Sequence, residues 1–359
     1  MSTRSRLLPA LVAASVLLAA CTSAATPAPT AAPTGAAPTA APTKTTDGTL
    51  PKPELTSIKI AATIAEAGQF ATMLAQRMGT YEKYGLQAQV IVFNDDGAVL
   101  QAMLSGQADM AQVGVAQVIN SVLTELPAKI VGVQKTKVVD GLFCGKDIKT
   151  AADVKGKSVG VSSLGSTGHA SALLALEGLK LTDKDVTIQS VGGQSARLAA
   201  LKSGAIGCAP ISIDLQGELS ALGINLVIDL SKSDLQYPAS SMASPVAFMQ
   251  KNPNTVLVVV ASLLEALNFM INKPTEAAAM YAAHAQLPQD KALAQVSAVK
   301  GFNNPSLKWK KEGFLFTQKV MAIVNPAILN VDVEKAYDMS VLQKLEEIGF
   351  YRKIGAPTQ

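Results

Sequence analysis

A glycine-rich turn carries the first residues whose chemistry could recognise a solute. Gly165-Ser166-Thr167-Gly168 stands directly before a segment with helical periodicity. Glycine lets backbone N–H groups converge at a helix start, where the Ser166 and Thr167 hydroxyls can cap the helix or donate to a ligand. An ordinary helix N-cap explains the same residues. Both interpretations stay open, and we expect Ser166 and Thr167 to donate to the polar head of a solute.

Acidic side chains stand in the other loops that could face a ligand, and basic ones do not. These loops contain Glu66, Asp95, Asp96 and Asp214, and the nearest cation is Arg197, one turn into its helix. An inorganic anion would therefore have to rely on backbone donors, whereas a carboxylate can accept a hydrogen bond from an amine. We expect an amine-bearing zwitterion or a neutral heterocycle rather than nitrate or sulfate. Phe70 and Tyr237 can supply an apolar wall or belong to the core.

The motifs of common catalytic sites are incomplete. Gly160-x-x-x-x-Gly165 is followed by serine instead of the lysine of a phosphate-binding loop, and His169 has no Gly-x-Ser-x-Gly turn beside it. We expect His169 and His284 on helix surfaces, and we predict no catalytic residue, no cofactor and no metal. Cys144 and Cys208 are expected as buried small side chains rather than a disulfide, although export would permit one.

Strand-like runs alternate with helix-period segments, and this order occurs twice. The first series predicts strands at 58–62, 88–93, 109–113 and 129–133, with helices over 70–81, 100–104 and 115–123 between them. The second predicts strands at 158–162, 186–191, 206–211 and 225–228, with helices at 167–179, 194–202 and 214–222. Ala102–Gly106 and Ala200–Gly204 occupy equivalent places, each with a glycine suited to a helix C-cap. We therefore predict an α/β fold of two similar lobes with parallel-type sheets.

Segments 137–144 and 242–249 are predicted as strands that cross between the lobes. The rest of the chain is helical in pattern, over 255–271, 275–285, 291–299, 313–324 and 333–348. These helices are expected to pack back on the first lobe, with Trp309 among them as a packing residue.

Ligands of open parallel sheets bind beyond the carboxyl ends of the strands, where helix N-termini also point. If the two lobes face each other across a hinge, the loops that follow their strands would line one cleft between them. The contacts that we expect from both lobes are Gln69, Phe70, Asp96, Gly97, Gln112, Gly114, Ser163, Gly165, Ser166, Thr167, Gly193 and Ser212.

The first residues have the layout of an export signal that ends in a lipobox. Arg4 and Arg6 precede a short apolar run, and Leu18-Ala19-Ala20-Cys21 resembles the lipidation site of bacterial lipoproteins. Residues 22–43 contain only Ala, Thr, Pro, Ser and Gly, which is typical of an extended tether. The chain of 359 residues is long enough for about two domains, and its net charge of +4, part of it in the leader, is too small to indicate a nucleic-acid surface.

Several short motifs, in their order along the chain, resemble the solute-binding proteins of ABC importers. They are the lipobox, Tyr81-Glu82-Lys83-Tyr84-Gly85-Leu86, Asp96-Gly97, Ser105-Gly106-Gln107-Ala108-Asp109, Val154–Val161 with Gly165-Ser166, and Ala200–Gly204. The branch is the one for aliphatic sulfonates, taurine, nitrate and thiamine-precursor pyrimidines. The resemblance implies a type II periplasmic-binding-protein fold that closes over its ligand and presents it to a permease. It covers residues 56–229 well and the helical tail loosely.

We therefore expect a lipid-anchored monomer on the outer face of the cytoplasmic membrane that delivers a small organic solute, either a sulfonate or taurine-like zwitterion or a pyrimidine, to an ABC permease. A sensing module for a membrane receptor and a relative of pyrimidine-forming enzymes are the alternatives. The expected divisions are a signal peptide at 1–20, a linker at 21–54 acylated at Cys21, lobe 1 at 55–138 plus 242–355, and lobe 2 at 139–241.

Overall fold

The computed structural model describes residues 47–63, 67–123, 128–233 and 237–358. The predicted signal peptide, Cys21 and most of the predicted tether lie outside the described residues. Lys44–Gln359 forms one compact unit, and it contains two β-sheets of five strands each. The fold is therefore α/β with two mixed sheets, as the sequence predicts except for the orientation of the crossing strands.

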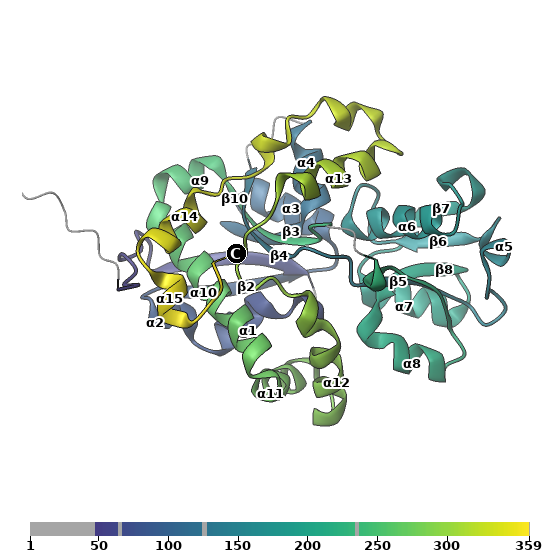
Figure 1. Ribbon diagram of the computed structural model, residues 1–359, viewed down its shortest axis with the longest axis horizontal. Helices are drawn as coiled ribbons and strands as arrows, with labels where there is room; N and C mark the ends of the chain where they lie inside the picture. Colours follow the sequence, from purple (N-terminus) through teal and green to yellow (C-terminus); the bar gives the residue numbers. More distant parts are fainter. Residues whose placement is uncertain (1–46, 64–66, 124–127, 234–236, 359) are drawn as a thin grey trace, which may run out of the picture. The chain divides into compact units, whose positions relative to one another are not determined.

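The first sheet has the strand order β2-β1-β3-β10-β4. Strands β1 and β2 pair in parallel along their whole length, β3 continues in parallel beside β1, and β10 runs antiparallel to both of its neighbours. The bounds are β1 (Ser57–Thr63), β2 (Gln87–Phe93), β3 (Met110–Gly114), β4 (Ala128–Lys135) and β10 (Ser240–Pro245). Helices cover both faces of this sheet (Figure 1). The helices between β1 and β4 are η1 (Ala67–Gln69), α1 (Ala71–Arg77), α2 (Thr80–Lys83), α3 (Asp96–Leu104) and α4 (Val115–Val122).

Two boundaries in this lobe differ from the prediction for local reasons. The helix expected over 70–81 is divided into α1 and α2 because Gly79 between them adopts a left-handed conformation, with φ of 66°. The crossing strand expected at 242–249 ends at Pro245, which cannot donate a backbone hydrogen bond to the sheet. The residues after it form the short helix α9 (Val246–Lys251).

The second sheet repeats the plan with the order β7-β6-β8-β5-β9. Its strands are β5 (Asp140–Cys144), β6 (Ser158–Val161), β7 (Thr187–Ser190), β8 (Cys208–Ser212) and β9 (Asn225–Asp229), and β5 is antiparallel to β8 and β9. The helices are α5 (Ala151–Val154), α6 (Thr167–Gly178), η2 (Asp183–Asp185), α7 (Gln194–Ser203), η3 (Ile213–Leu215), α8 (Gln216–Ala221) and η4 (Leu230–Lys232). The helix expected at 214–222 thus begins as a 3₁₀ turn. Each lobe receives its antiparallel strand from a crossing segment.

A disulfide joins Cys144 and Cys208, so the expectation of two unpaired cysteines is wrong. The two residues lie directly opposite each other on the neighbouring strands β5 and β8. The sequence could not reveal this register, because it depends on where the crossing strand enters the sheet.

The C-terminal helices are α10 (Pro253–Asn272), α11 (Pro274–Ala285), α12 (Gln289–Val299), η5 (Lys300–Phe302), α13 (Lys311–Ala322), η6 (Pro326–Asn330), η7 (Val333–Ala336), α14 (Ser340–Glu347) and α15 (Phe350–Ile354). By length and composition α10 could cross a membrane, but 78% of its apolar window is buried and it packs on α1, α2 and α14 as a core helix. The helix expected at 333–348 is divided into η7 and α14, because Tyr337 is extended and bridges to Ile130.

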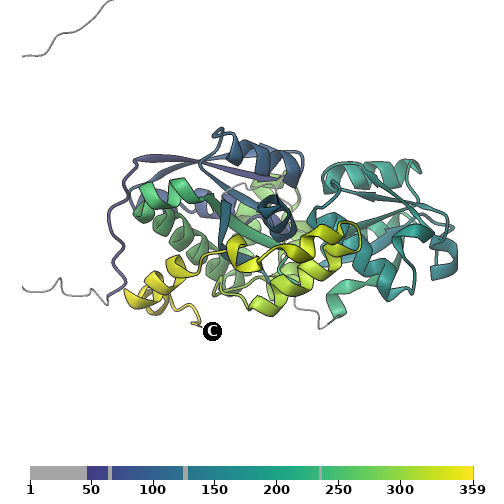
Figure 2. The ribbon, with the colours of Figure 1, turned by 90° about the horizontal axis from the view of Figure 1, so that it is seen from above.

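The C-terminal helices pack on the first lobe as expected, and two of them also reach the second lobe, where α12 contacts η3 and α13 contacts α6. In Figure 2 the helices from green to yellow gather beside the first lobe, and α13 reaches toward α6. Trp309 packs against Phe314 and Tyr337, with ring centroids 5.8 and 5.4 Å away, which confirms its packing role.

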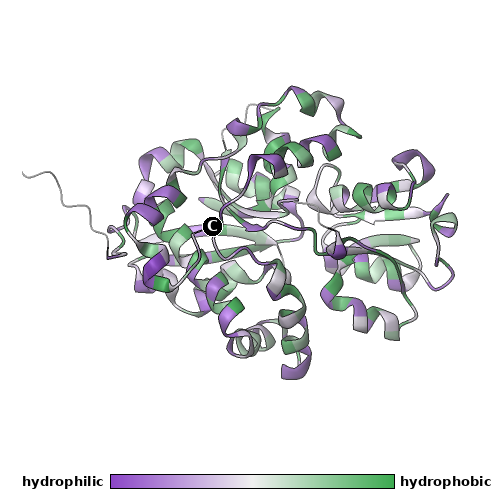
Figure 3. Ribbon diagram, viewed as in Figure 1, coloured by the Kyte–Doolittle hydropathy of each residue, from purple (hydrophilic) through white to green (hydrophobic). Residues whose placement is uncertain are grey.

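Hydrophobic residues occur along the strands of both sheets and on parts of the surrounding helices (Figure 3). One buried cluster extends from the first sheet and α10 to α6 in the second lobe. A separate cluster, which includes Phe143, Leu201, Ile211 and Leu219, fills the other face of the second sheet. The paired sheets therefore hold the loops at their strand ends in fixed positions.

Candidate binding cleft between the lobes

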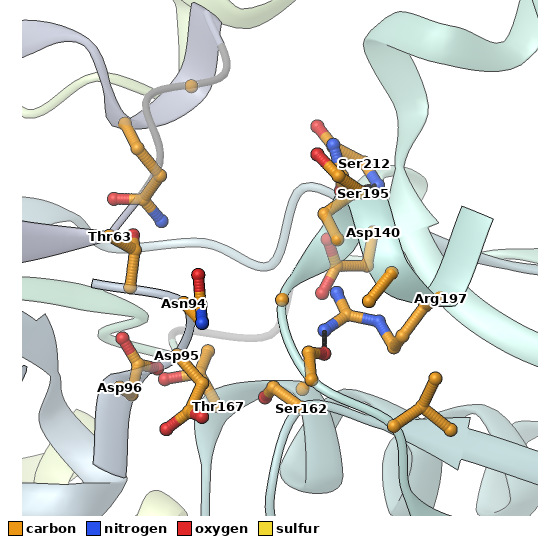
Figure 4. Close-up of a pocket in the computed structure, with 18 of the residues that line it drawn as sticks. Thr63, Asn94, Asp95, Asp96, Asp140, Ser162, Thr167, Ser195, Arg197 and Ser212 are labelled. Atoms are coloured by element: carbon orange, nitrogen blue, oxygen red, sulfur yellow. Dashed lines mark hydrogen bonds between the residues drawn. The ribbon is translucent and has the colours of Figure 1, made fainter. Parts of the chain in front are cut away.

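A cavity of about 610 Å³ is lined by residues from both sheets. The first sheet contributes the carboxyl ends of β1, β2 and β4, and the second contributes the loops after β6, β7 and β8. Figure 4 shows Thr63, Asn94, Asp95 and Asp96 on one side and Ser195, Arg197 and Ser212 on the other. The cavity thus lies at the strand ends where parallel sheets usually hold ligands.

Five of the twelve expected contacts line this cavity: Gln69, Asp96, Thr167, Gly193 and Ser212. Gln112 lies behind Gln69 and donates from Nε2 to Gln69 Oε1 at 2.8 Å, while Ser240 donates to the same oxygen at 3.0 Å. Gln112 thus orients a lining side chain without lining the cavity itself. Gly97 is likewise absent from the lining and sits in the first turn of α3.

Ser166 acts as the N-cap of α6, which is the simpler of the two interpretations of its turn. Its side chain is fully buried, accepts from the backbone N–H of His169 at 3.2 Å and lies 2.6 Å from the hydroxyl of Ser162. Of the two hydroxyls expected to meet a solute, only that of Thr167 belongs to a lining residue.

His169 is buried, so its expected place on a helix surface is wrong. Its Nδ1 accepts a hydrogen bond from the Gly165 backbone N–H at 2.9 Å, and burial lowers the pKa of its imidazole. A neutral ring fits this acceptor role. His284 stays partly exposed, beside Arg77 and Phe70.

The turn at residues 163–167 contacts the first lobe. Gln117 donates to Ser163 Oγ at 3.3 Å, Asn120 donates to the Gly165 carbonyl at 3.0 Å, and Thr167 donates to the Ala239 carbonyl at 3.1 Å. Ser163 and Gly165 are therefore placed at the seam between the lobes.

Two expected contact glycines mark places where the lobes touch. A Cβ at Gly114 would lie 2.1 Å from Thr167 Oγ1, and a Cβ at Gly193 would lie 2.4 Å from the Asn94 carbonyl oxygen. Both distances are too short for any side chain. The described structure is therefore a closed state in which each lobe presses against the other beside the cavity.

The two aromatic candidates belong to the core. Phe70 is fully buried, with its ring 5.2 Å from that of Tyr281, and Tyr237 is fully buried beside Phe316. Tyr281 and Phe316 come from the C-terminal helices, so the sequence pattern around Phe70 and Tyr237 gave no sign of these contacts. Neither ring forms an apolar wall of the cavity.

Sequence reasoning missed two charged residues of the lining. Lys135 ends β4, and its ammonium lies 2.4 Å from where a Cβ of Gly68 would stand. Asp140 begins β5 and accepts from the Ser171 hydroxyl at 2.6 Å. Two signals in the sequence were available: Lys135 lies just after a predicted strand, and Asp140 lies within a predicted crossing strand. Arg197, expected as the nearest cation, does line the cleft, and Lys135, which lies outside the loops considered from the sequence, is a second cation there.

Burial shapes the charges of the cleft. It raises the pKa of Asp96 to about 6, with the negative charge of Asp95 adding to the effect and Arg197 opposing it. Burial also raises the pKa of Asp214, against the attraction of Lys135. Arg197 donates to the carbonyls of Pro210 at 3.2 Å and Gly192 at 3.0 Å, which fixes the loop before its helix.

No three histidine, cysteine, aspartate or glutamate side chains among the described residues are grouped so as to hold a metal ion. The arrangement offers carboxylates, cations and hydroxyls that can enclose a small polar molecule by hydrogen bonds and charge pairs.

Two α/β lobes, crossing strands and a polar cavity between the strand ends define the type II periplasmic-binding-protein fold. Solved structures with the same fold include the alkanesulfonate-binding protein SsuA of Xanthomonas axonopodis pv. citri bound to MOPS, with a TM-score of 0.66 and 18% identity over 77% of this chain and 94% of that one. The nitrate-binding protein NrtA of Synechocystis PCC 6803 has a TM-score of 0.67 and 14% identity over 83% and 90%.

The chain belongs to the NMT1/THI5-like family, whose model matches residues 68–277. A Brucella abortus (strain 2308) protein that is named as a binding protein is 29% identical over 246 residues, which are 65% of this chain and 72% of that protein.

Proposed function

We propose that the protein is the solute-binding component of an ABC importer and that it captures a small organic solute between its two lobes. The observation that carries this proposal is the cavity of about 610 Å³, which residues at the strand ends of both sheets line. Because each lobe supplies part of the lining, only the closed form makes every contact with a guest, and a ligand shifts the population toward closure.

The proposed solute is a taurine-like zwitterion or a pyrimidine. Carboxylates and cations occur together in the lining, so a molecule with both donors and acceptors can be matched at each end. The alkanesulfonate-binding relative makes sulfonates a natural first class to examine. The proposed contacts are the five expected residues that line the cavity, Gln69, Asp96, Thr167, Gly193 and Ser212, together with Lys135, Asp140 and Arg197. Gln112 acts by orienting Gln69, and Ser163 and Gly165 act through the seam between the lobes.

Export and a lipid anchor at Cys21 are part of the proposal, and they rest on the leader and lipobox of the sequence. Acyl chains on Cys21 would keep the binding lobes beside a membrane permease at the end of the Ala/Pro/Thr-rich tether. Replacing Cys21 with alanine is expected to move the protein from the membrane fraction to the soluble fraction.

A thermal-shift screen tests the proposed function. Sulfonates, amino acids, pyrimidines and small anions are added to the purified protein, and a true ligand at 100 times its dissociation constant should stabilise the fold by about 2.7 kcal/mol. Calorimetry with one binding site per chain and no chemical change in the recovered solute would support binding. Turnover of the solute would favour the enzyme alternative, and no stabilisation by any member of the panel would count against the proposal.

A further inference from the structure

The charges of the cavity are unevenly balanced. Three carboxylates line it, those of Asp95, Asp96 and Asp140, against the cations of Lys135 and Arg197. Arg197 already donates to two backbone carbonyls. A solute that carried only negative charge would add to this excess, and like charges in a confined site cost several kcal/mol.

The charges also form two groups, and each group contains residues of both lobes. Asp95 and Asp96 follow β2 in the first lobe, and Arg197 is close enough across the cleft to influence the Asp96 carboxyl. Lys135 ends a strand of the first lobe, and its positive charge acts to lower the pKa of Asp214 in the second lobe. Each group therefore contains at least as many carboxylates as cations, so neither is a dedicated anion site.

Asp96 is the carboxylate best placed to meet a ligand. Asp95 caps α3 by accepting from the Ala98 N–H at 3.0 Å, and Asp140 accepts from Ser171. Asp96 lines the cavity at the seam, where its Oδ2 lies 2.9 Å from the position of a Cβ on Gly114. A cation held there would lie next to the contact between the two lobes.

Unpartnered polar atoms lie on the second lobe and point to the other end of the ligand. Ser212 is 7% exposed and lines the cavity beside the Asp214 carboxyl, whose pKa its side chain lowers, and its hydroxyl makes no hydrogen bond of good geometry among the described residues. The same is true of Nε2 of Gln194, whose Oε1 accepts from the Ser212 N–H at 2.8 Å. Buried donors without partners are costly, so an acceptor group of a ligand would satisfy them.

We propose that the solute carries an ammonium or another protonated amine held by Asp96 on the first lobe, and an acceptor-bearing head held by Ser212 and Gln194 on the second. This inference rests on the proposed function and narrows it. Asp96 is then the specificity-determining residue of the cleft. It selects against anions that lack an amine, and it couples the charge of the ligand to closure because it lies at the seam.

Matched pairs of probes test this assignment. Taurine and isethionate share a sulfonate and differ in an ammonium against a hydroxyl, and an aminomethylpyrimidine and its hydroxymethyl counterpart differ in the same way. Calorimetry at pH 7.5 should give at least about tenfold tighter binding for the amine of one pair, since a charge-assisted contact is lost in its partner. Asp96→Asn should reduce that ratio by about tenfold or more, whereas Asp290→Asn, at an exposed position of α12, should leave it unchanged.

The outcomes separate the two proposals. Equal or tighter binding of isethionate, sulfate or nitrate than of any amine would overturn the assignment of Asp96 while the solute-binding function stands. An unchanged amine-to-hydroxyl ratio in the folded Asp96→Asn variant would overturn it as well. If no probe of either series binds, both the amine assignment and the proposed solute classes are wrong.

Discussion

A buried carboxyl group in the lining of the cavity affects the stability of the empty protein as well as its selectivity. The pKa of Asp96 in the folded state is about 6, against the ordinary value of 3.8, chiefly because of burial and secondarily because of Asp95. The folded state therefore binds the proton more tightly than the unfolded chain does. The stability associated with this proton is fully present below pH 4 and is lost as the pH rises through 6.

Asp96→Asn removes this dependence. The difference in the free energy of unfolding between the variant and the wild type should grow in favour of the variant by about 2–3 kcal/mol from pH 4 to pH 7.5, since one pKa unit corresponds to 1.36 kcal/mol. Urea unfolding curves of both proteins at several pH values, without solute, measure this difference. A difference that stays constant over this range would show that Asp96 titrates normally.

Single residues also mark how far the sequence could predict the site. Gln69, Asp96, Thr167, Gly193 and Ser212 follow predicted strands or open predicted helices, and strand ends are where local pattern and ligand geometry coincide. The placement of Phe70 depended on Tyr281 in α11, more than two hundred residues later. No local pattern carries that information. A sequence window shows which residues can be polar contacts, and tertiary packing decides which of them face the cavity.

Elements were predicted best where the chain itself marks their ends. Helix α7 ends at Ser203, directly before Gly204, which has a φ of 75°, and α3 ends at Leu104, two residues before Gly106, which has a φ of 78°. Glycine favours this left-handed conformation, and both stops were predicted from it. The antiparallel entry of β5 and β10 into the sheets has no such marker, because it follows from the path of the chain between the lobes.

The disulfide between β5 and β8 is a consequence of that path, and it should stabilise the second lobe. A cross-link that closes a loop of this length, with a sequence separation of 64, contributes about 2–4 kcal/mol, largely by restricting the unfolded chain. The double variant Cys144→Ala/Cys208→Ala should lose this amount in urea unfolding. Hydrogen exchange should become faster in β6 to β9, while β1 and β2 keep their protection.

A reductant provides the control for this prediction. It should lower the stability of the wild type toward that of the double variant and leave the variant itself unchanged. Equal stability of oxidised wild type and variant would contradict a stabilising cross-link.

At the scale of the whole molecule, binding depends on whether the two lobes can meet. Gly114 on the first lobe leaves room for Thr167 on the second, since a Cβ there would lie 2.1 Å from the threonine Oγ1. The backbone of Gly114 has a φ of −62°, which any residue adopts, so alanine introduces no backbone strain. Its methyl group would strain the contact with Thr167 across the seam most, and within the first lobe it would also lie 2.9 Å from Asp96 Oδ2. Gly114→Ala should therefore fold normally and close incompletely.

Overpacking of this kind costs about 1–3 kcal/mol, so Gly114→Ala should weaken solute binding by about ten- to a hundredfold, with little change in the melting temperature of the empty protein. Calorimetry with the tightest binder of the thermal-shift screen measures the affinity, and small-angle scattering with that solute should show a larger radius of gyration than in the wild type. Gly217→Ala is the matched control, because a Cβ at that position of α8 meets nothing within 4 Å.

A second substitution tests whether the contact between the lobes causes the weaker solute binding of Gly114→Ala. Thr167→Ala removes the hydroxyl that the new methyl group would strike, at the expense of its hydrogen bond to the Ala239 carbonyl. In the double variant Gly114→Ala/Thr167→Ala, the affinity should be no lower than in Thr167→Ala alone, a strongly non-additive result of the kind that residues in direct contact give. If the two losses simply add, the seam at Gly114 does not control closure, and the weakening must arise within the first lobe.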